Sequence, residues 1–128
     1  NMVIIEGLFY TKDHDWVRID GDVATIGITD YAQQMLGELV FVELPDIGRE
    51  YAAGDELAIV ESTKAANDIY CPAAGKVIEV NEELESQPEL VNQDCYNAGW
   101  ICKLQLADIK SIESLMDSKQ YEEYLAGR

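Results

Sequence analysis

The sequence has few basic residues, and this shortage excludes two classes of partner. Nine lysine and arginine residues face 25 acidic residues, which gives a net charge of −16. Such a surface repels the phosphates of nucleic acids and anionic membranes, so we expect neither as a partner. The charge favours solubility, or partner proteins that present basic patches.

Long apolar runs are also absent. No segment approaches the ~20 consecutive apolar residues that span a bilayer. The first residues show neither the basic and apolar regions of a secretory signal nor the arginine-rich character of a transit peptide. We therefore expect a cytoplasmic protein if the source is bacterial, or a mitochondrial matrix protein if the chain is a processed eukaryotic form.

Cysteine and histidine are scarce as well. Cys71, Cys95 and Cys102 form no C-x-x-C pair, and His14 is the only histidine, so no metal site is expected. We expect reduced thiols, as in a cytosolic compartment. Cys102 lies in an alternating pattern and is predicted to be a small apolar core residue. Because an acid–base role needs a positioned partner, we expect His14 to pack or to bond a turn.

Most of the chain has the pattern of β-strands. The expected strands are residues 16–19, 23–28, 39–44, 57–61, 68–71, 75–80 and 100–106. Asp20-Gly21-Asp22, between the first two, is a strong hairpin signal. One short helix is expected to begin at Asp30 as its N-cap and to end at Gly37.

The last third of the chain differs in character. Residues 81–97 are rich in Asn, Gln and Glu and are expected to form an acidic loop. Apolar residues recur at helical spacing within about 108–126, which predicts two C-terminal helices. Asp108 and either Asp117 or Ser118 are the expected caps. These helices are predicted to cover an open barrel end or a sheet face.

One unit, a glycine followed by strand, loop and strand, occurs twice. Residues 37–42 resemble residues 75–80, 38 positions later. Residues 54–60 loosely match 99–104, 45 positions later, which places a seven-residue insertion in the second loop. Two such copies suggest a quasi-two-fold β sandwich. We expect a mainly β fold in a single domain over residues 1–128, with its core at about 8–106.

Residues 61–67 lie between two expected strands and must turn the chain back. Lys64 would then project from a hairpin tip, with small neighbours that leave it open to a modifying enzyme. A Schiff-base lysine must be desolvated so that it loses its proton near neutral pH. Glu61 and Asp68 favour the charged ammonium instead, so Lys64 suits an attachment point better than a base. By position alone, a solvated surface lysine is the favoured explanation, because most lysines are exposed.

The segment Glu61-Ser62-Thr63-Lys64-Ala65 resembles the lipoylation loop of glycine cleavage H proteins. The resemblance extends from about Leu8 to Leu125, in one order along the chain, and is therefore far more specific than the loop alone. It is carried by Tyr-Thr-Lys-Asp-His-Asp-Trp-Val at 10–17, Val-Ala-Thr-Ile-Gly-Ile-Thr-Asp-Tyr-Ala-Gln at 23–33, Phe-Val-Glu-Leu-Pro at 41–45, Gly-Lys-Val-Ile-Glu-Val-Asn at 75–81, Pro-Glu-Leu-Val-Asn at 88–92 and Gly-Trp at 99–100.

This resemblance implies a lipoyl-domain-like barrel-sandwich hybrid and a carrier that has no catalysis of its own. Lipoic acid would be joined to Lys64 by an amide bond. The arm would take the methylamine group of glycine from glycine decarboxylase and offer it to an aminomethyltransferase. Dihydrolipoamide dehydrogenase would then reoxidise the arm, and lipoate attachment enzymes would load it. One tether would thus serve three active sites.

The resemblance also implies roles for other residues. Recognition by the attachment enzyme is implied for Glu61, Gly48 and Gly75, although turns with φ > 0 explain both glycines as well, and Glu61 is equally a solvating charge at a strand end. A cleft for the loaded arm is implied at Asp13, Asp15, Ile28, Met35 and Asp68, where an acidic residue would hold the methylamine cation.

The chain departs from the family at a few of its positions. Asp15 stands where Glu is usual, which shortens its reach, and Met35 occupies a position that varies. Thr63 stands where Val is common, and Cys71 where Ser is common.

Several alternatives belong to other classes. A lipoyl domain of a 2-oxo-acid dehydrogenase would have Pro/Ala-rich linkers and centre on Asp-Lys-Ala, and a biotinyl carrier would place Met on both sides of Lys64. The sequence has none of these features. An H-like protein that relays lipoate to other enzymes stays open. An enzyme is disfavoured because no nucleophile–base pair, phosphate loop or metal cluster is visible.

Overall fold

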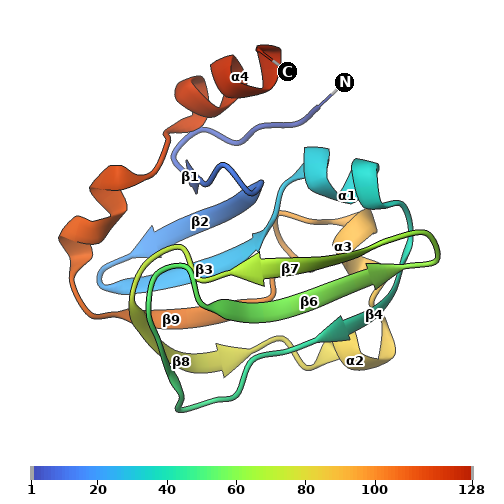
Figure 1. Ribbon diagram of the computed structural model, residues 1–128, viewed down its shortest axis with the longest axis horizontal. Coiled ribbons are helices and arrows are strands. Elements are labelled where there is room, and N and C mark those ends of the chain that lie inside the picture. The colour runs from blue at the N-terminus through green and yellow to red at the C-terminus, as the bar shows by residue number, and fades with distance from the viewer. Residues whose placement is uncertain (1, 128) are drawn as a thin grey trace.

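Two antiparallel sheets form the framework of the computed structural model, which describes residues 2–127 (Figure 1). The larger sheet has the order β1 (Phe9–Tyr10), β2 (Asp15–Asp20), β3 (Val23–Ile28), β9 (Cys102–Leu106), β8 (Gly75–Val80) and β5 (Glu50–Tyr51). The smaller has the order β4 (Leu39–Glu43), β6 (Glu56–Ser62) and β7 (Ala66–Tyr70). The mainly β class is confirmed, and the two-residue strands β1 and β5 are the ones that the sequence pattern missed.

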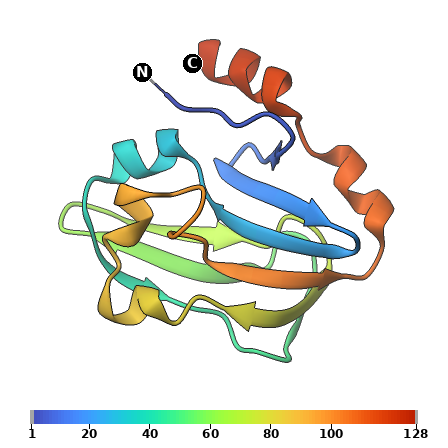
Figure 2. The same ribbon diagram turned by 180° about the vertical axis from the view of Figure 1, so that it is seen from behind.

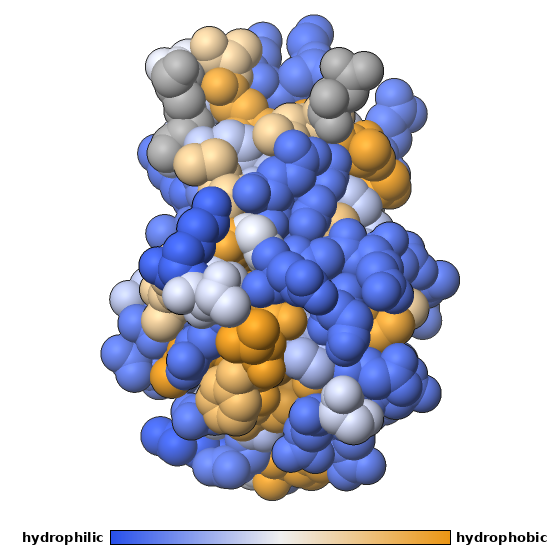
Figure 3. All heavy atoms as spheres, turned by 90° about the vertical axis from the view of Figure 1, so that its right-hand side faces the viewer, coloured by the Kyte–Doolittle hydropathy of each residue, from blue (hydrophilic) through white to orange (hydrophobic). Residues whose placement is uncertain are grey.

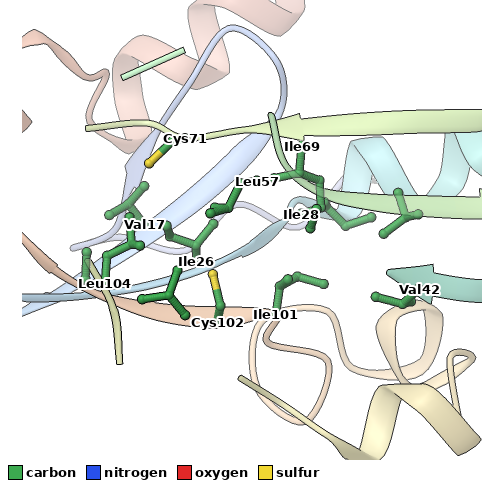
Figure 4. Packing of buried hydrophobic residues seen from close by; sticks show 14 of the residues in the cluster. Val17, Ile26, Ile28, Val42, Leu57, Ile69, Cys71, Ile101, Cys102 and Leu104 are labelled. Atoms are coloured by element: carbon green, nitrogen blue, oxygen red, sulfur yellow. The ribbon is translucent and has the colours of Figure 1, made fainter. Parts of the chain in front are cut away.

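The two sheets bury their apolar faces against each other. Val17 and Ile26 from the larger sheet and Leu57 and Ile69 from the smaller one are at most 4% exposed. Figure 4 shows these side chains pointing into the space between the sheets. Each such residue contributes about 1.5–3 kcal/mol on burial. Cys102 lies in the same core with no exposed surface, as predicted for a small apolar residue.

The internal repeat is real, but its second half was matched out of register. Each copy pairs its own two strands, β4 with β6 and β8 with β9. A bulge interrupts the first strand of each copy, at Val40 and at Ile78, 38 positions apart. Val60 and Cys102 occupy equivalent registers, 42 positions apart, so the second loop is four residues longer. The predicted seven-residue insertion was wrong because short apolar strands resemble one another.

The N-cap of the internal helix α1 (Asp30–Leu36) lies one residue before the predicted one. Thr29 is the N-cap, and its hydroxyl oxygen accepts a hydrogen bond from the Ala32 amide. Asp30 is therefore the first helical residue, where a carboxylate favours the helix dipole. Gly37 ends the helix as expected, with φ of 81°.

The expected loop at 81–97 contains two short helices, α2 (Glu83–Ser86) and α3 (Leu90–Gln93). The loop prediction was wrong because polar neighbours mask Leu84 and Val91, which have no exposed surface. α2 packs against β4, and α3 packs against α1. The longer loop of the second copy therefore covers one end of the sandwich, as Figure 2 shows from behind.

The C-terminal segment forms a 3-10 helix, η1 (Ile109–Ser114), and an α-helix, α4 (Ser118–Ala126). Asp108 caps the first, and Asp117 caps the second in a capping box with Gln120. Tyr121 of α4 is fully buried and stacks on Tyr10 of β1 at 4.5 Å between ring centroids, so α4 covers the edge of the larger sheet. Within residues 2–127, no helix has the length and apolar character needed to cross a bilayer.

Candidate functional site

Lys64 lies at the tip of the β6–β7 hairpin. The Ser62 amide donates to the Ala65 carbonyl at 2.8 Å, and the Ser62 hydroxyl oxygen accepts from the Ala65 amide at 3.1 Å. These bonds close the turn without the side chain of Lys64, which is exposed together with Thr63, Ala65 and Ala66. The structure therefore leaves the lysine amine accessible at a turn between small neighbours, as the sequence predicts.

The stem of Lys64 folds back over the connection between α1 and β4. Its Cε and Nζ lie 3.5 Å and 4.0 Å from the position that a Cβ at Gly37 would occupy. Figure 1 and Figure 2 both show the hairpin tip beside this connection. Neither ion pair found within residues 2–127 includes Lys64. The ammonium is thus not held in a buried pair.

Two cavities share residues 12–13 as part of their lining: one also borders α1 and β7, and the other borders residues 70–72 and 114–116. One, of about 400 Å³, is lined by Asp13, Met35 and Asp68 among others. The other, of about 300 Å³, is lined by Asp15 and again by Asp13. Because Lys12, Asp13 and Tyr70 line both, the cavities are neighbours, and we call the two together the arm groove.

The arm groove contains four of the five residues expected in a cleft. Asp13, Asp68 and Met35 come together in its first part, and Asp15 lies in its second. Ile28 lines neither part, so the prediction that it lies in the cleft was wrong. The alternation of β3 directs its side chain into the core between the sheets, where it is 1% exposed (Figure 4).

The carboxyl group of Asp15 is the most perturbed acid of the groove. Asp15 is only 2% exposed, and burial raises the pKa of its carboxyl group well above the usual 3.8. A hydrogen bond from the Thr11 hydroxyl at 3.2 Å opposes this rise, and the like charge of Asp13 adds to it. A buried carboxyl group that lines a cavity can bind a cation from it.

The three residues expected to guide lipoate attachment do not gather at Lys64. Glu61 lies on the hairpin itself, in register with Phe41 and Ala66. The Gly48 amide bonds the Val77 carbonyl in β8, and Gly75 begins that strand. Figure 1 shows the start of β8 at the end of the sandwich opposite the hairpin tip.

A turn with positive φ, the alternative explanation for both glycines, holds for Gly48 only. Gly48 has φ of 91°, and a side chain there would meet open space. Gly75 has no positive φ and is buried, so its turn explanation was wrong. A Cβ at Gly75 would lie 2.7 Å from the Gln105 carbonyl oxygen, because β8 and β9 approach closely there.

Aromatic residues form a wall of the arm groove that sequence reasoning did not find. Tyr31, Tyr70 and Tyr124 line it beside His14. His14 has φ of 68°, its Nδ1 lies 2.9 Å from the Tyr121 hydroxyl, and its ring centroid lies 4.5 Å from that of Tyr31. The expected packing role of His14 is confirmed. These aromatic residues come from distant segments and share no local motif that could have revealed them.

The comparisons with known proteins agree with this architecture. The family model described as glycine cleavage H-protein matches residues 8–128. The chain belongs to this family. It is 52% identical over 124 residues to the glycine cleavage system H protein of Halothermothrix orenii, covering 97% of each chain. It is 53% identical over 116 residues to that of Parvibaculum lavamentivorans, covering 91% of this chain and 93% of the other.

A solved structure of an H protein shows the same fold. The crystal structure of a glycine cleavage system H protein from Mycobacterium marinum matches with a TM-score of 0.88 at 35% identity. The match covers 96% of this chain and 99% of the other. The family resemblance and the lipoyl-domain-like fold that it implied are therefore confirmed.

Proposed function

We propose that this H-protein family member carries lipoic acid on Lys64 and shuttles the methylamine group of glycine from glycine decarboxylase to the aminomethyltransferase. The observation that carries the proposal is an exposed lysine at a hairpin tip beside a groove with an acidic lining. Lys64 fits the attachment because its side chain is exposed and takes no part in the hydrogen bonds that close its turn.

When bound, lipoic acid supplies a dithiolane that takes up the methylamine group and, as a dithiol, passes electrons to dihydrolipoamide dehydrogenase. The chain itself contributes tethering and shelter. Asp13, Asp15 and Asp68 offer carboxylates to a cationic amine, and the apolar atoms of Met35 and Tyr70 reduce the access of water. Catalysis is left to the partner enzymes, so the chain acts as a non-catalytic carrier.

The surface supports protein partners with basic patches. Figure 3 shows the end of the molecule that carries the hairpin tip: hydrophilic residues cover most of it, and a hydrophobic patch interrupts its lower half. Val40 and Phe41 of β4, the strand that pairs with β6, are 55% and 47% exposed. An acidic surface with an apolar centre suits partners whose lysines and arginines surround an apolar contact.

Attachment of the lipoyl group is the remaining part of the proposal. Glu61 lies three residues before Lys64 on the same hairpin and is partly exposed, so an attachment enzyme can contact both. Gly48 and Gly75 act at a distance, by shaping the turn before β5 and the packing of β8 on β9. The cytoplasmic compartment and the extent of the single domain stay predictions.

Lys64→Arg tests the proposal, with Lys76→Arg, a second exposed lysine on β8, as the matched control. Arginine keeps the charge but cannot accept the amide bond, so we expect an unchanged circular dichroism spectrum and no lipoyl mass increment. Glycine–bicarbonate exchange with the decarboxylase should be lost in Lys64→Arg and kept in the control. Undiminished exchange would refute the tethered arm. Lipoylation at Lys64 of the unaltered protein without exchange would instead indicate a lipoate relay.

A further inference from the structure

One side chain holds both ends of the connection between α1 and β4. Asn92, in α3, donates from Nδ2 to the Gly37 carbonyl at 2.8 Å and to Gln33 Oε1 at 3.0 Å. Its Oδ1 accepts from the Leu39 amide at 2.9 Å. A single amide group therefore fixes the last residues of the helix and the first residue of the strand, on either side of exposed Glu38.

This connection needs support from outside itself. Gly37 has φ of 81° and ψ of −169°, a region that almost only glycine occupies. Its carbonyl group follows the end of a helix, where carbonyl groups lack a partner within the helix. Its amide bonds the Gln33 carbonyl, and its carbonyl depends on Asn92. Without Asn92 the Gly37 peptide would lose its fixed orientation.

The stem of Lys64 lies beside this same glycine. Lys64 Cε lies 3.5 Å from the position of a Cβ at Gly37, a distance typical of van der Waals contact. The stem therefore lies over the face of Gly37 from which a side chain would project. The Gly37 peptide therefore borders the end of the lysine stem, where the arm would be joined.

We propose that Asn92 is a positioning residue for the arm: it fixes Gly37, and Gly37 seats the stem of Lys64. The inference rests on the proposed function, because it gives Lys64 the role of arm root. It also gives a role to α3, which lies in the loop that is longer in the second copy of the repeat. A preorganised arm root reduces the ordering cost when an enzyme binds the lysine.

Asn81 provides a matched control. Its Nδ2 donates to the Ala98 carbonyl at 2.9 Å and to the Trp100 carbonyl at 2.8 Å, so it makes the same number of donor contacts as Asn92. It is 6% exposed and makes none of its hydrogen bonds to the α1–β4 connection. Asn81→Ala should therefore lower stability without moving the arm root.

The first measurement is the nuclear Overhauser effect between the Lys64 Hε protons and the Gly37 Hα protons in the unmodified protein. We expect it in the unaltered chain and in Asn81→Ala, and we expect its loss in Asn92→Ala. The second is the rate of lipoyl attachment by a lipoate ligase at a temperature where all variants are folded. Asn92→Ala should lower kcat/KM about fivefold, the effect of one net hydrogen bond, and Asn81→Ala should leave it unchanged.

Asn92→Asp keeps the acceptor for Leu39 but removes both donors, and it replaces Asn92→Ala if that variant fails to fold. An unchanged Overhauser effect in the folded Asn92 variant, or equal losses in the Asn81 variant, would overturn the inference. Failure of the proposed function is distinguishable, since attachment to a residue other than Lys64 in the unaltered chain would refute the carrier site. The Overhauser measurement tests Asn92 whether or not any lipoyl group is attached.

Discussion

The buried carboxyl group of Asp15 should make the protein less stable as the pH rises. Burial raises the pKa of this group well above the usual 3.8, so the native state keeps its proton longer than the unfolded state does. Below about 3.8 the group is neutral in both states, and its contribution to stability is fully present. That contribution is lost as the pH rises towards the native pKa.

The magnitude follows from the number of protons bound. Between the two pKa values the native state binds one proton more than the unfolded state, so stability falls by about 1.4 kcal/mol per pH unit. Above the native pKa the loss stops. Asn at position 15 has nearly the same size, can accept the hydrogen bond from Thr11, and does not titrate. Between the two pKa values, the free energy of unfolding of Asp15→Asn should therefore rise relative to that of the unaltered protein by about 1.4 kcal/mol per pH unit.

Urea unfolding of both proteins from pH 4 to pH 8 measures this difference, because the other acids contribute equally and cancel. The control repeats the comparison in proteins that also carry Asp13→Asn. Removing the like charge lowers the pKa of Asp15, so the stability difference caused by Asp15→Asn should stop growing at a lower pH. A difference in stability that stays constant across this range would refute the reasoning, since Asp15 would then titrate as an exposed group. A cation bound in the arm groove beside Asp15 would offset the cost of burying its ionised carboxylate.

Two further predictions concern the core. Gly27→Ala should lower the free energy of unfolding by about 2–4 kcal/mol, because its Cβ would lie 2.5 Å from the fully buried ring of Trp16. Urea unfolding measures the loss, and a change as small as that in Gly127→Ala, where φ is −84° and the Cβ would meet no atom closer than 3.7 Å, would contradict it. The three buried thiols should resist a disulfide reagent at pH 8 until the protein is denatured, since burial raises the pKa of Cys71 to about 11 and that of Cys95 to about 12. Rapid labelling of the native protein would argue against this burial.

The strands and the exposed turn at Lys64 are largely local features, and the sequence predicted them. Alternating apolar residues around Asp20-Gly21-Asp22 specify the β2–β3 hairpin, because the pleat and the turn are set by neighbouring residues. Residues 61–67 likewise place Lys64 at a tip, since small polar residues between two strands must reverse the chain. These features depend on residues that are close along the chain.

Short helices and close contacts were harder to predict. α2 and α3 each bury one apolar side chain, and a single Leu84 or Val91 among polar residues gives no helical period. Gly75 looked like a turn glycine, but the approach of β9 explains it. The bulges at Val40 and Ile78 show the true register of the repeat only once the strands are paired.

By itself, the sequence determined the strand pattern, the reversal at Lys64 and the acidic charge, because each follows from local sterics, hydrogen bonding or composition. Only the tertiary structure decided which side chains share the arm groove, since these come from the turn at 12–14, from α1, from β7 and from α4. It also decided that Ile28 faces the core and that Asn92 bonds Gly37, 55 residues before it in the chain. Contacts between distant segments depend on how the two sheets and their covering helices close around one core, and no local pattern encodes that closure.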